Sequence, residues 1–197
     1  MTLDILIPLL GFALAGVITP GPNNVMLVAS GANFGYRRSL PHMFGVGLGL
    51  PFMVIPVGLG VMQLFEAWPP LRTVLQIACF LYLLWLAWKI AHAAAPKDAA
   101  TTGKPLSFLQ ASAFQWVNPK AWTMALGAIT LYAPGREFSA VLWVAAAYAA
   151  MAVISTNTWV LAGQKLRQWL ENERRLKTFN RTMAALLVVS MVPALLG

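Results

Sequence analysis

Long uncharged stretches separated by short charged segments make up most of the 197 residues. Five stretches carry no formal charge, and a sixth is interrupted only by Lys120. Because a helix needs about 20 largely apolar residues to cross the hydrocarbon core of a bilayer, this pattern predicts six membrane-spanning helices. We expect these helices near residues 4–30, 41–63, 72–92, 107–132, 139–163 and 179–196.

Composition supports an integral membrane protein and argues against several other classes. Hydrophobic residues make up 59% of the chain and charged residues 10%, whereas about a quarter of a soluble domain is charged. The net charge of +8 does not indicate a nucleic-acid partner, because the basic residues lie between apolar stretches and form no single basic face. One cysteine excludes an internal disulfide. Since the sequence shows no paired acids, catalytic triad or metal-ligand cluster, we expect neither an enzyme nor a bound metal or cofactor.

The basic residues concentrate in alternate connections. Eleven lie in or beside the first, third and fifth connections, whereas the second and fourth contain only Arg72 and Arg136. Cytoplasmic connections of membrane proteins are enriched in Lys and Arg. We therefore expect the odd-numbered connections in the cytoplasm and both termini on the periplasmic or extracellular side.

The six predicted helices divide into two groups of three. Each group has an odd number of spans, so the two groups insert with opposite orientations, as in transporters built from inverted-topology repeats. We expect a single transmembrane transporter domain over residues 1–197, with repeat one at about 1–94 and repeat two at about 105–197. A cytoplasmic linker at about 95–104 joins the repeats.

Prolines and polar residues interrupt the first helix of each group. The segment Thr19-Pro20-Gly21-Pro22-Asn23-Asn24 lies within the first predicted helix, and Asn118-Pro119-Lys120 lies within the fourth. Because proline removes a backbone donor, we expect helices 1 and 4 to be broken there. Freed backbone groups are tolerated in a membrane where they face protein or a wet cavity. Paired breaks in corresponding positions therefore indicate a transporter's binding site.

Residues at the breaks offer groups that bind an amino acid. Each break can start a new half-helix, with Thr19 or Asn118 as its N-cap, and the exposed N–H groups attract a carboxylate. Lys120 offers a second carboxylate contact if it faces the cavity, or snorkels to the headgroups if the helix boundary is displaced. Asn157, beside Ser155 and Thr156, either lines the cavity or makes an ordinary interhelical hydrogen bond.

No predicted helix core carries a carboxylate, since Asp and Glu are absent between positions 5 and 65 and between 99 and 136. A cationic substrate would lack a counter-ion, which favours a neutral zwitterion, and a carboxylate proton relay is also missing. His42, at the cytoplasmic end of the second helix, either titrates or is an ordinary polar residue at the membrane interface, and we favour the second interpretation. Gly45 and Gly49 have the spacing of a close helix–helix contact.

The motif Thr19-Pro-Gly-Pro-Asn-Asn24, followed by Gly31, Gly35-Tyr36-Arg37 and Gly45-x3-Gly49, resembles the signature of the lysine-exporter (LysE/RhtB) family of amino-acid exporters. The likeness extends over essentially the whole chain and is strongest to the cysteine and O-acetylserine exporter group. It implies a bacterial inner-membrane, multi-pass protein that moves amino acids or close derivatives outward, with the proton as coupling ion. The family positions carried over are Pro20, Gly21, Pro22, Asn23, Gly31, Gly35, Arg37, Gly45, Gly49, Asn118 and Pro119. Many members have an acidic residue where this chain has Asn23, a departure that weakens any assignment of cationic substrates or proton coupling to that position.

Together these features predict a secondary exporter of small neutral amino acids, of the cysteine, O-acetylserine, threonine or homoserine type, that works by alternating access. The expected substrate-binding residues are Thr19, Pro20, Gly21, Pro22, Asn23, Asn24, Asn118, Pro119, Lys120 and Asn157. The alternative is a non-transporting membrane scaffold or sensor subunit. A metal-ion or redox carrier is less favoured, because it needs a ligand cluster or two thiols. The partners expected are the substrate and the lipid bilayer, with a homo-oligomer left open and no nucleic acid.

Overall fold

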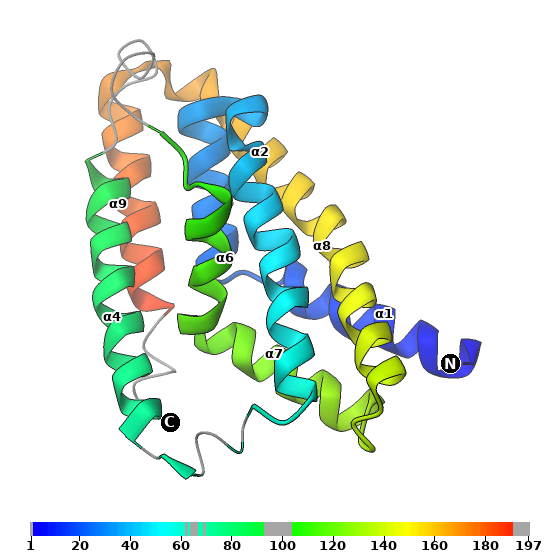
Figure 1. Cartoon of the computed structure of the whole chain (residues 1–197). Coiled ribbons are helices and arrows are strands. Elements are labelled where there is room, and N and C mark those ends of the chain that lie inside the picture. Colours follow the sequence, from blue (N-terminus) through cyan, green and yellow to red (C-terminus); the bar gives the residue numbers. More distant parts are fainter. Residues whose placement is uncertain (1, 62, 64–66, 69, 93–103, 191–197) are drawn as a thin grey trace.

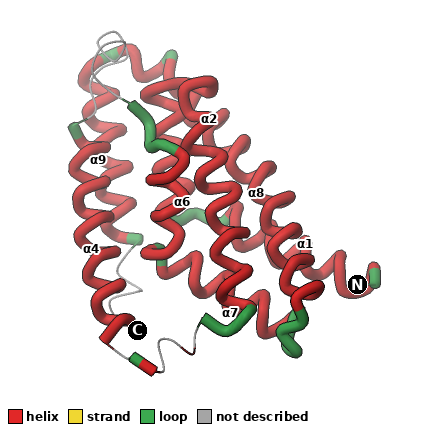
Figure 2. The backbone as a smooth tube through the Cα atoms, viewed as in Figure 1, coloured by secondary structure: helices red, strands yellow, loops and turns green. Residues whose placement is uncertain are grey.

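The computed structural model is a bundle of helices in which residues 2–61, 63, 67–68, 70–92 and 104–190 are described (Figure 1). Within these ranges Figure 2 shows helices and loops and no strand, which confirms the predicted all-helical class. The elements in chain order are α1 (Leu3–Ile18), α2 (Pro22–Gly58), α4 (Pro70–Ala91), α6 (Phe108–Val117), α7 (Pro119–Tyr132), α8 (Phe138–Arg167), the 3-10 turn η1 (Trp169–Glu171) and α9 (Glu173–Val189).

Three helices of the described chain are long and apolar enough to cross a membrane. They are α2, residues Thr73–Ala91 within α4, and α8. The predicted first and fourth spans are broken, so α1 has only 16 residues, α6 has 10 and α7 has 14. Each of these pieces is shorter than the roughly 20 residues that a bilayer requires, as expected where proline interrupts a helix.

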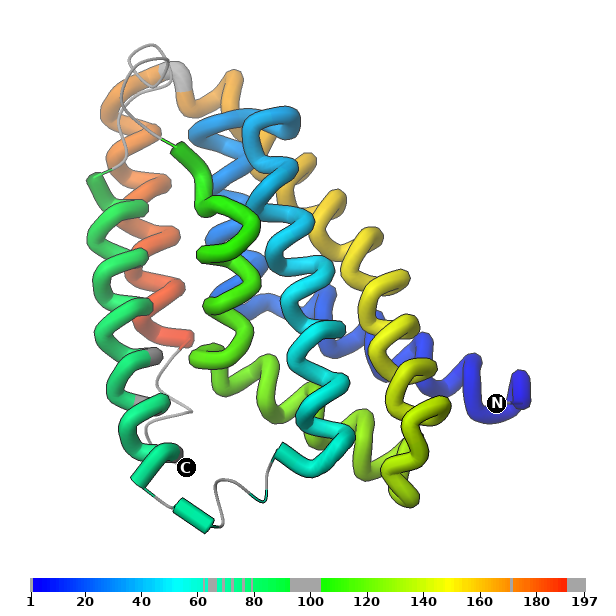
Figure 3. Tube along the Cα trace, in the orientation of Figure 1, coloured from blue at the N-terminus to red at the C-terminus, as the bar shows by residue number. Residues whose placement is uncertain are grey.

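The chain reverses direction inside α2, at Gly35 (Figure 3). Gly35 has φ 75° and ψ 173°, a conformation that glycine adopts at little cost because it has no Cβ atom. We call residues 22–34 the first limb of α2 and residues 36–58 its second limb. A connection over about 31–40 was predicted, and this was wrong. One glycine makes the whole turn, so that Arg37 already belongs to the second limb.

The boundary between the last two helices also differs from the prediction. α8 continues to Arg167, and after η1 the next helix begins at Glu173 and not near residue 179. Asn172 starts this helix, because its side chain accepts hydrogen bonds from the backbone N–H groups of Arg174 and Arg175. Charged residues that suggested a connection are good helix formers once an N-cap is present. The expected end near residue 196 lies outside the described residues.

α2 occupies the centre of the bundle, packed against α8 and against α6. α4 and α9 lie side by side at one edge, and α1 and α7, which contact each other, are inclined to the upright helices (Figure 1). Two clusters of buried apolar side chains hold these elements together. The first includes Leu9, Met53, Ala125 and Tyr148, and the second includes Met26, Leu83, Phe114 and Leu187.

Two glycines bring the first limb of α2 into backbone contact with α8. A Cβ atom placed on Gly31 would lie 2.1 Å from the carbonyl oxygen of Val160. A Cβ atom placed on Gly163 would likewise lie 2.1 Å from the carbonyl oxygen of Val28. Each glycine therefore accommodates the backbone of the other helix, and neither position has room for a side chain.

Two further glycines, Gly45 and Gly49, face α6 from the second limb. Added Cβ atoms would lie 2.5 Å from the carbonyl oxygen of Phe108 and 2.7 Å from the Cα atom of Ser112. The hydroxyl of Ser112 donates to the carbonyl of Gly45 at 3.1 Å. This close approach holds the last turn of α6, which carries Gln115, against the centre of the bundle.

Candidate functional site

The two helix breaks lie against each other although about 100 residues separate them in the sequence. The Nζ atom of Lys120, in the first turn of α7, donates to the carbonyl oxygen of Thr19 at 2.5 Å and to that of Pro20 at 3.4 Å. The side chain of Lys120 passes close to Gly21, where an added Cβ atom would lie 2.9 Å from Cδ of the lysine. The ammonium group of Lys120, at the second break, thus forms hydrogen bonds with carbonyl groups of the first break.

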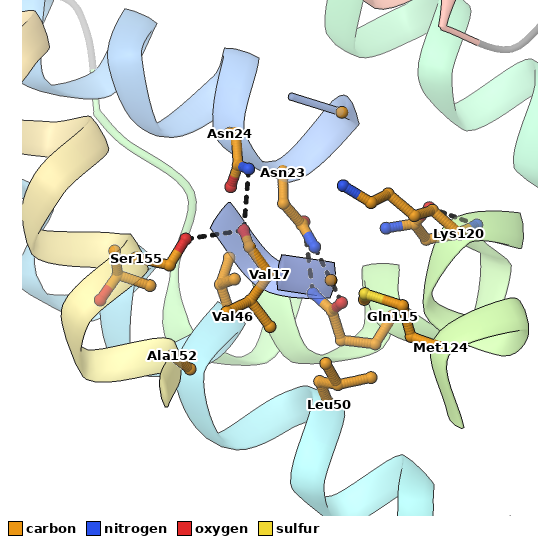
Figure 4. Close-up of a pocket in the computed structure, with 14 residues that line it drawn as sticks. Val17, Asn23, Asn24, Val46, Leu50, Gln115, Lys120, Met124, Ala152 and Ser155 are labelled. Carbon is orange, nitrogen blue, oxygen red and sulfur yellow. Dashed lines mark hydrogen bonds between the residues drawn. The ribbon is translucent and has the colours of Figure 1, made fainter. Parts of the chain in front are cut away.

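Side chains from other helices satisfy the carbonyl groups that the first break frees. The prolines lack N–H groups and Gly21 is extended, with φ −179°, so the last carbonyls of α1 lose their helical donors. The carbonyl of Val17 accepts from Nδ2 of Asn24 at 2.9 Å and from the hydroxyl of Ser155 at 2.7 Å (Figure 4). The same Asn24 nitrogen donates to the carbonyl of Thr19 at 2.7 Å. The break is therefore stabilised by α2, α7 and α8 together.

The two expected N-caps behave differently. The side chain of Asn118, which is 1% exposed, accepts from the backbone N–H of Lys120 at 3.1 Å, so it caps α7 as predicted. Thr19 was the wrong choice for α2, because Gly21 is the residue that precedes that helix. The hydroxyl of Thr19 instead donates back into α1, to the carbonyl of Ala15.

Proline occupies the first position of the helix after each break. Pro22 begins α2 and Pro119 begins α7. This position suits proline, because the first N–H of a helix has no partner within the helix and the ring fixes a helical φ. The two prolines therefore define where the half-helices start, and their neighbours supply the polar contacts.

A pair of amides joins the breaks on a second side (Figure 4). Nδ2 of Asn23 donates to Oε1 of Gln115 at 2.9 Å, and Nε2 of Gln115 donates to Oδ1 of Asn23 at 3.4 Å and to the carbonyl of Ala111 at 2.9 Å. The side chain of Gln115 is fully buried. The sequence analysis missed Gln115, although its position one turn before Asn118 on an apolar helix was a usable signal.

These residues surround a small space that we call the central pocket (Figure 4). Its volume is about 30 Å³, which holds a water molecule. Among the described residues that line it, Lys120 carries the one charge, and the other polar groups are amides, hydroxyls and backbone carbonyls. The lining consists of Gly16, Val17, Gly21, Asn23, Asn24, Val46, Leu50, Gln115, Asn118, Lys120, Met124, Ala152, Ser155 and Thr156.

Asn157 lies outside the central pocket, although its neighbours Ser155 and Thr156 line it. The hydroxyl of Tyr36 donates to Oδ1 of Asn157 at 2.6 Å, so this asparagine makes the interhelical hydrogen bond that was its alternative interpretation. One residue along a helix turns the side chain by about 100°, which separates Asn157 from the pocket.

Beside the Gly35 turn, Asn157 lines an open cavity of about 920 Å³ with a basic rim. Its basic residues are Arg37, Arg38, Lys165 and Arg167.

In the part of the chain that the structure describes, no three His, Cys, Asp or Glu side chains gather as a metal site would require. The central pocket therefore offers hydrogen bonds and one ammonium group to a ligand.

Comparison with known proteins identifies the chain's relatives. The model of the family described as LysE type translocator matches residues 14–194. Proteins named cysteine/O-acetylserine efflux protein, from Escherichia coli strain K12 and from Shigella sonnei strain Ss046, are each 31% identical over 185 residues, covering 92% of this chain and 92% of the relative. No solved structure matches the chain.

The family match covers both helix breaks and every described helix except the first part of α1. LysE exporters are multi-pass proteins of the inner membrane and are transporters, not enzymes. The pairing of two broken helices around a polar pocket agrees with that class of protein. The chain belongs to the LysE family of translocators.

Proposed function

We propose that this protein exports small neutral amino acids or close derivatives, of the cysteine, O-acetylserine, threonine or homoserine type, across the bacterial inner membrane. The observation that carries the proposal is the contact between the two helix breaks, where Lys120 lies on the carbonyls of Thr19 and Pro20. Family membership and the names of the relatives support export of an amino acid. The scaffold alternative gives no reason for two polar breaks to meet inside a membrane protein.

The central pocket has complementary groups for the two charges of a zwitterion. The ammonium of Lys120 and the first N–H groups of α2 and α7 favour a carboxylate. The carbonyls at the end of α1 and the amide oxygens of Asn23 and Gln115 favour an ammonium group. No carboxylate lines the described pocket, so a second positive charge on the substrate would have no counter-ion.

Binding by this scheme is an exchange of partners at Lys120. In the present arrangement its ammonium is held by the carbonyls of Thr19 and Pro20. When a zwitterion enters, its carboxylate takes over Lys120 and its ammonium takes over the released carbonyls. The number of charged hydrogen bonds is conserved, which limits the cost of desolvating the substrate.

The pocket must widen for this exchange, because its volume of about 30 Å³ admits water and not an amino acid. Alternating access by two inverted repeats, residues 1–94 and 105–197, supplies such a movement. The packing is consistent with repeats of this kind: α4, the last helix of the first half, contacts α9, the last helix of the second half, so these corresponding elements lie together. We place both termini on the periplasmic side, from the basic connections.

Counterflow in liposomes tests the proposal. Purified protein is reconstituted into liposomes, and the liposomes are loaded with unlabelled O-acetylserine or cysteine. The assay then measures entry of the labelled compound into the liposomes. Lys120→Gln should raise the KM by about 10- to 150-fold, the equivalent of losing one charge-assisted hydrogen bond.

The matched control is Lys177→Gln, because Lys177 is exposed on α9, with 63% of its side chain accessible. This variant should behave as the wild type. If wild-type protein moves none of the four amino acids in either direction, the proposed function is wrong. If Lys120→Gln and Lys177→Gln behave alike, the substrate site lies elsewhere.

A further inference from the structure

His42 is fully enclosed in the bundle yet makes no hydrogen bond within the described residues. It lies in the second limb of α2, its residue is 1% exposed, and neither Nδ1 nor Nε2 has a partner. An imidazole has one donor and one acceptor when neutral, and burying either without a partner is unfavourable. The interpretation of His42 as a polar residue at a membrane surface was therefore wrong. The second limb begins at residue 36, so residue 42 is already within the bundle.

The ring of His42 faces a cavity of about 70 Å³, which we call the histidine pocket. A space of this size holds water, although both ring nitrogens are closed off from it in the present arrangement. The lining comes from both limbs of α2, from α4 and from the segment before α6: Met26, Ala29, Ser30, Asn33, Phe34, His42, Leu86, Lys89, Ile90, Lys104, Pro105 and Leu106.

The polar groups around the histidine pocket are already engaged with one another. The hydroxyl of Ser30 shares a hydrogen bond of 2.8 Å with that of Ser39, which also donates to the carbonyl of Gly35. Asn33 donates to Oδ1 of Asn180, on α9, at 3.1 Å. These hydrogen bonds fix the walls of the pocket and leave the ring nitrogens of His42 without a partner.

The charged groups that face the pocket are both cationic. Lys89 comes from α4, where its ammonium lies 5.0 Å from the centre of the Trp85 ring, and Lys104 comes from the segment before α6. The first limb of α2, the second limb and α9 contribute no charged residue to the described lining, and no carboxylate lines it. Nothing here would hold a permanent imidazolium charge, so a proton on His42 would be bound transiently.

The histidine pocket adjoins the central pocket along the second limb. His42, Val46 and Leu50 are spaced four residues apart and share one helix face, and Val46 and Leu50 line the central pocket. Four residues correspond to a rise of about 6 Å. Met26 and Val46, members of one buried cluster, lie at the boundary between the two pockets. His42 is therefore one helical turn from a residue that lines the central pocket.

We infer that His42 is the proton-binding site that couples export to the proton gradient, an inference that rests on the proposed function. No predicted helix core contains an acidic residue, and the other histidine of the chain, His92, is exposed at the end of α4. In the cycle, a ring nitrogen of neutral His42 binds one proton from the outer side. The same N–H bond breaks when the movement of alternating access exposes the ring and the proton passes to water on the cytoplasmic side, while the substrate leaves in the opposite direction.

Two transport assays on the same liposomes test this role. Counterflow exchanges substrate without net proton movement, whereas an imposed O-acetylserine gradient moves protons, which an enclosed pH-sensitive dye reports. His42→Gln, which keeps an amide but cannot titrate, should retain counterflow and lose substrate-driven proton movement. Ser30→Ala, which alters the same pocket without touching a titratable group, should retain both.

Three other results would contradict either this inference or the proposed function. Proton movement in His42→Gln at the wild-type ratio to substrate excludes His42 as the site. Wild-type counterflow without proton movement also overturns the inference while leaving the proposed function standing. Absence of wild-type counterflow with any of the four amino acids refutes the proposed function itself.

A spectroscopic measurement keeps the inference testable if His42→Gln fails to fold. In His92→Gln protein labelled with nitrogen-15 histidine, His42 is the one remaining ring, because the chain has 2 histidines. Antiport requires that proton and substrate weaken each other's binding, so O-acetylserine should move the titration midpoint of the ring to lower pH. A ring that does not titrate between about pH 5 and 8, or whose titration midpoint does not change with the substrate, would exclude His42.

Discussion

Replacing Gly163 by alanine should destabilise the protein by forcing α2 and α8 apart. The new Cβ atom would lie 2.1 Å from the carbonyl oxygen of Val28, which is a backbone atom, so the two helices must separate to admit it. Overpacking of a close contact typically costs about 1–3 kcal/mol. For a chain of this length, each kcal/mol corresponds to about 2–4 °C in Tm, so we expect Tm to fall by about 2–12 °C.

Thermal unfolding in detergent measures this effect, and two other glycines provide matched controls. An added Cβ at Gly47, also in α2, would have its nearest neighbour at 3.9 Å, and one at Gly11, in α1, would have none within 4 Å. Because alanine favours a helix over glycine by about 1 kcal/mol, Gly47→Ala and Gly11→Ala should leave Tm unchanged or raise it. If Gly163→Ala unfolds at the same temperature as Gly47→Ala, the backbone contact between α2 and α8 is not as tight as described.

Three further sets of variants test other parts of the structure. Asn23→Ala and Gln115→Ala should each weaken substrate binding. The double variant should lose less binding free energy than the two single variants together, with a coupling energy of about 0.5–3 kcal/mol. Losses that simply add, measured as Kd, would contradict the amide pair. Gly35→Ala should lower the free energy of unfolding by about 1–3 kcal/mol, because φ 75° and ψ 173° lie in a region that is essentially restricted to glycine. An unchanged denaturation midpoint would argue against the single-residue turn. Asn172→Ala should cost about 0.5–2 kcal/mol as the N-cap of α9 is lost, whereas Asn172→Asp, which keeps the acceptor oxygen, should not.

The positions of the helix breaks could be predicted because they depend on local chemistry. Pro20, Pro22 and Pro119 lack the N–H groups that a continuous helix requires, and Asn118 is a strong N-cap residue beside a proline. The Gly35 turn was harder to predict, because one glycine replaced a connection that normally takes several residues. The charges at Arg37 and Arg38 pointed to a loop, and such residues are equally compatible with the first turn of a helix.

Contacts between distant segments could not be predicted, because nothing local specifies the partner. Gly163 resembles any other glycine of an apolar helix until Val28 is placed against it at 2.1 Å. Gln115 and Asn157 were equally ambiguous, since an amide in a span either lines a cavity or joins two helices. Gln115 both lines the central pocket and joins α6 to α2 through Asn23. Asn157 joins α8 to α2 through its hydrogen bond with Tyr36.

Lys120 illustrates what sequence reasoning omitted. A helix break frees carbonyl acceptors at the end of one half-helix as well as N–H donors at the start of the next, and the carbonyl end carries the negative pole of the helix dipole. From the sequence, the N–H donors at the start of each half-helix led us to expect an anionic ligand group. The acceptors at Thr19 and Pro20 equally require a cation, and the one charged residue of the other break supplies it. The freed carbonyls of a helix break therefore need a cationic partner such as an ammonium group. A zwitterion is the class of ligand that can replace both groups of this contact at once, because its ammonium binds the carbonyls while its carboxylate binds Lys120.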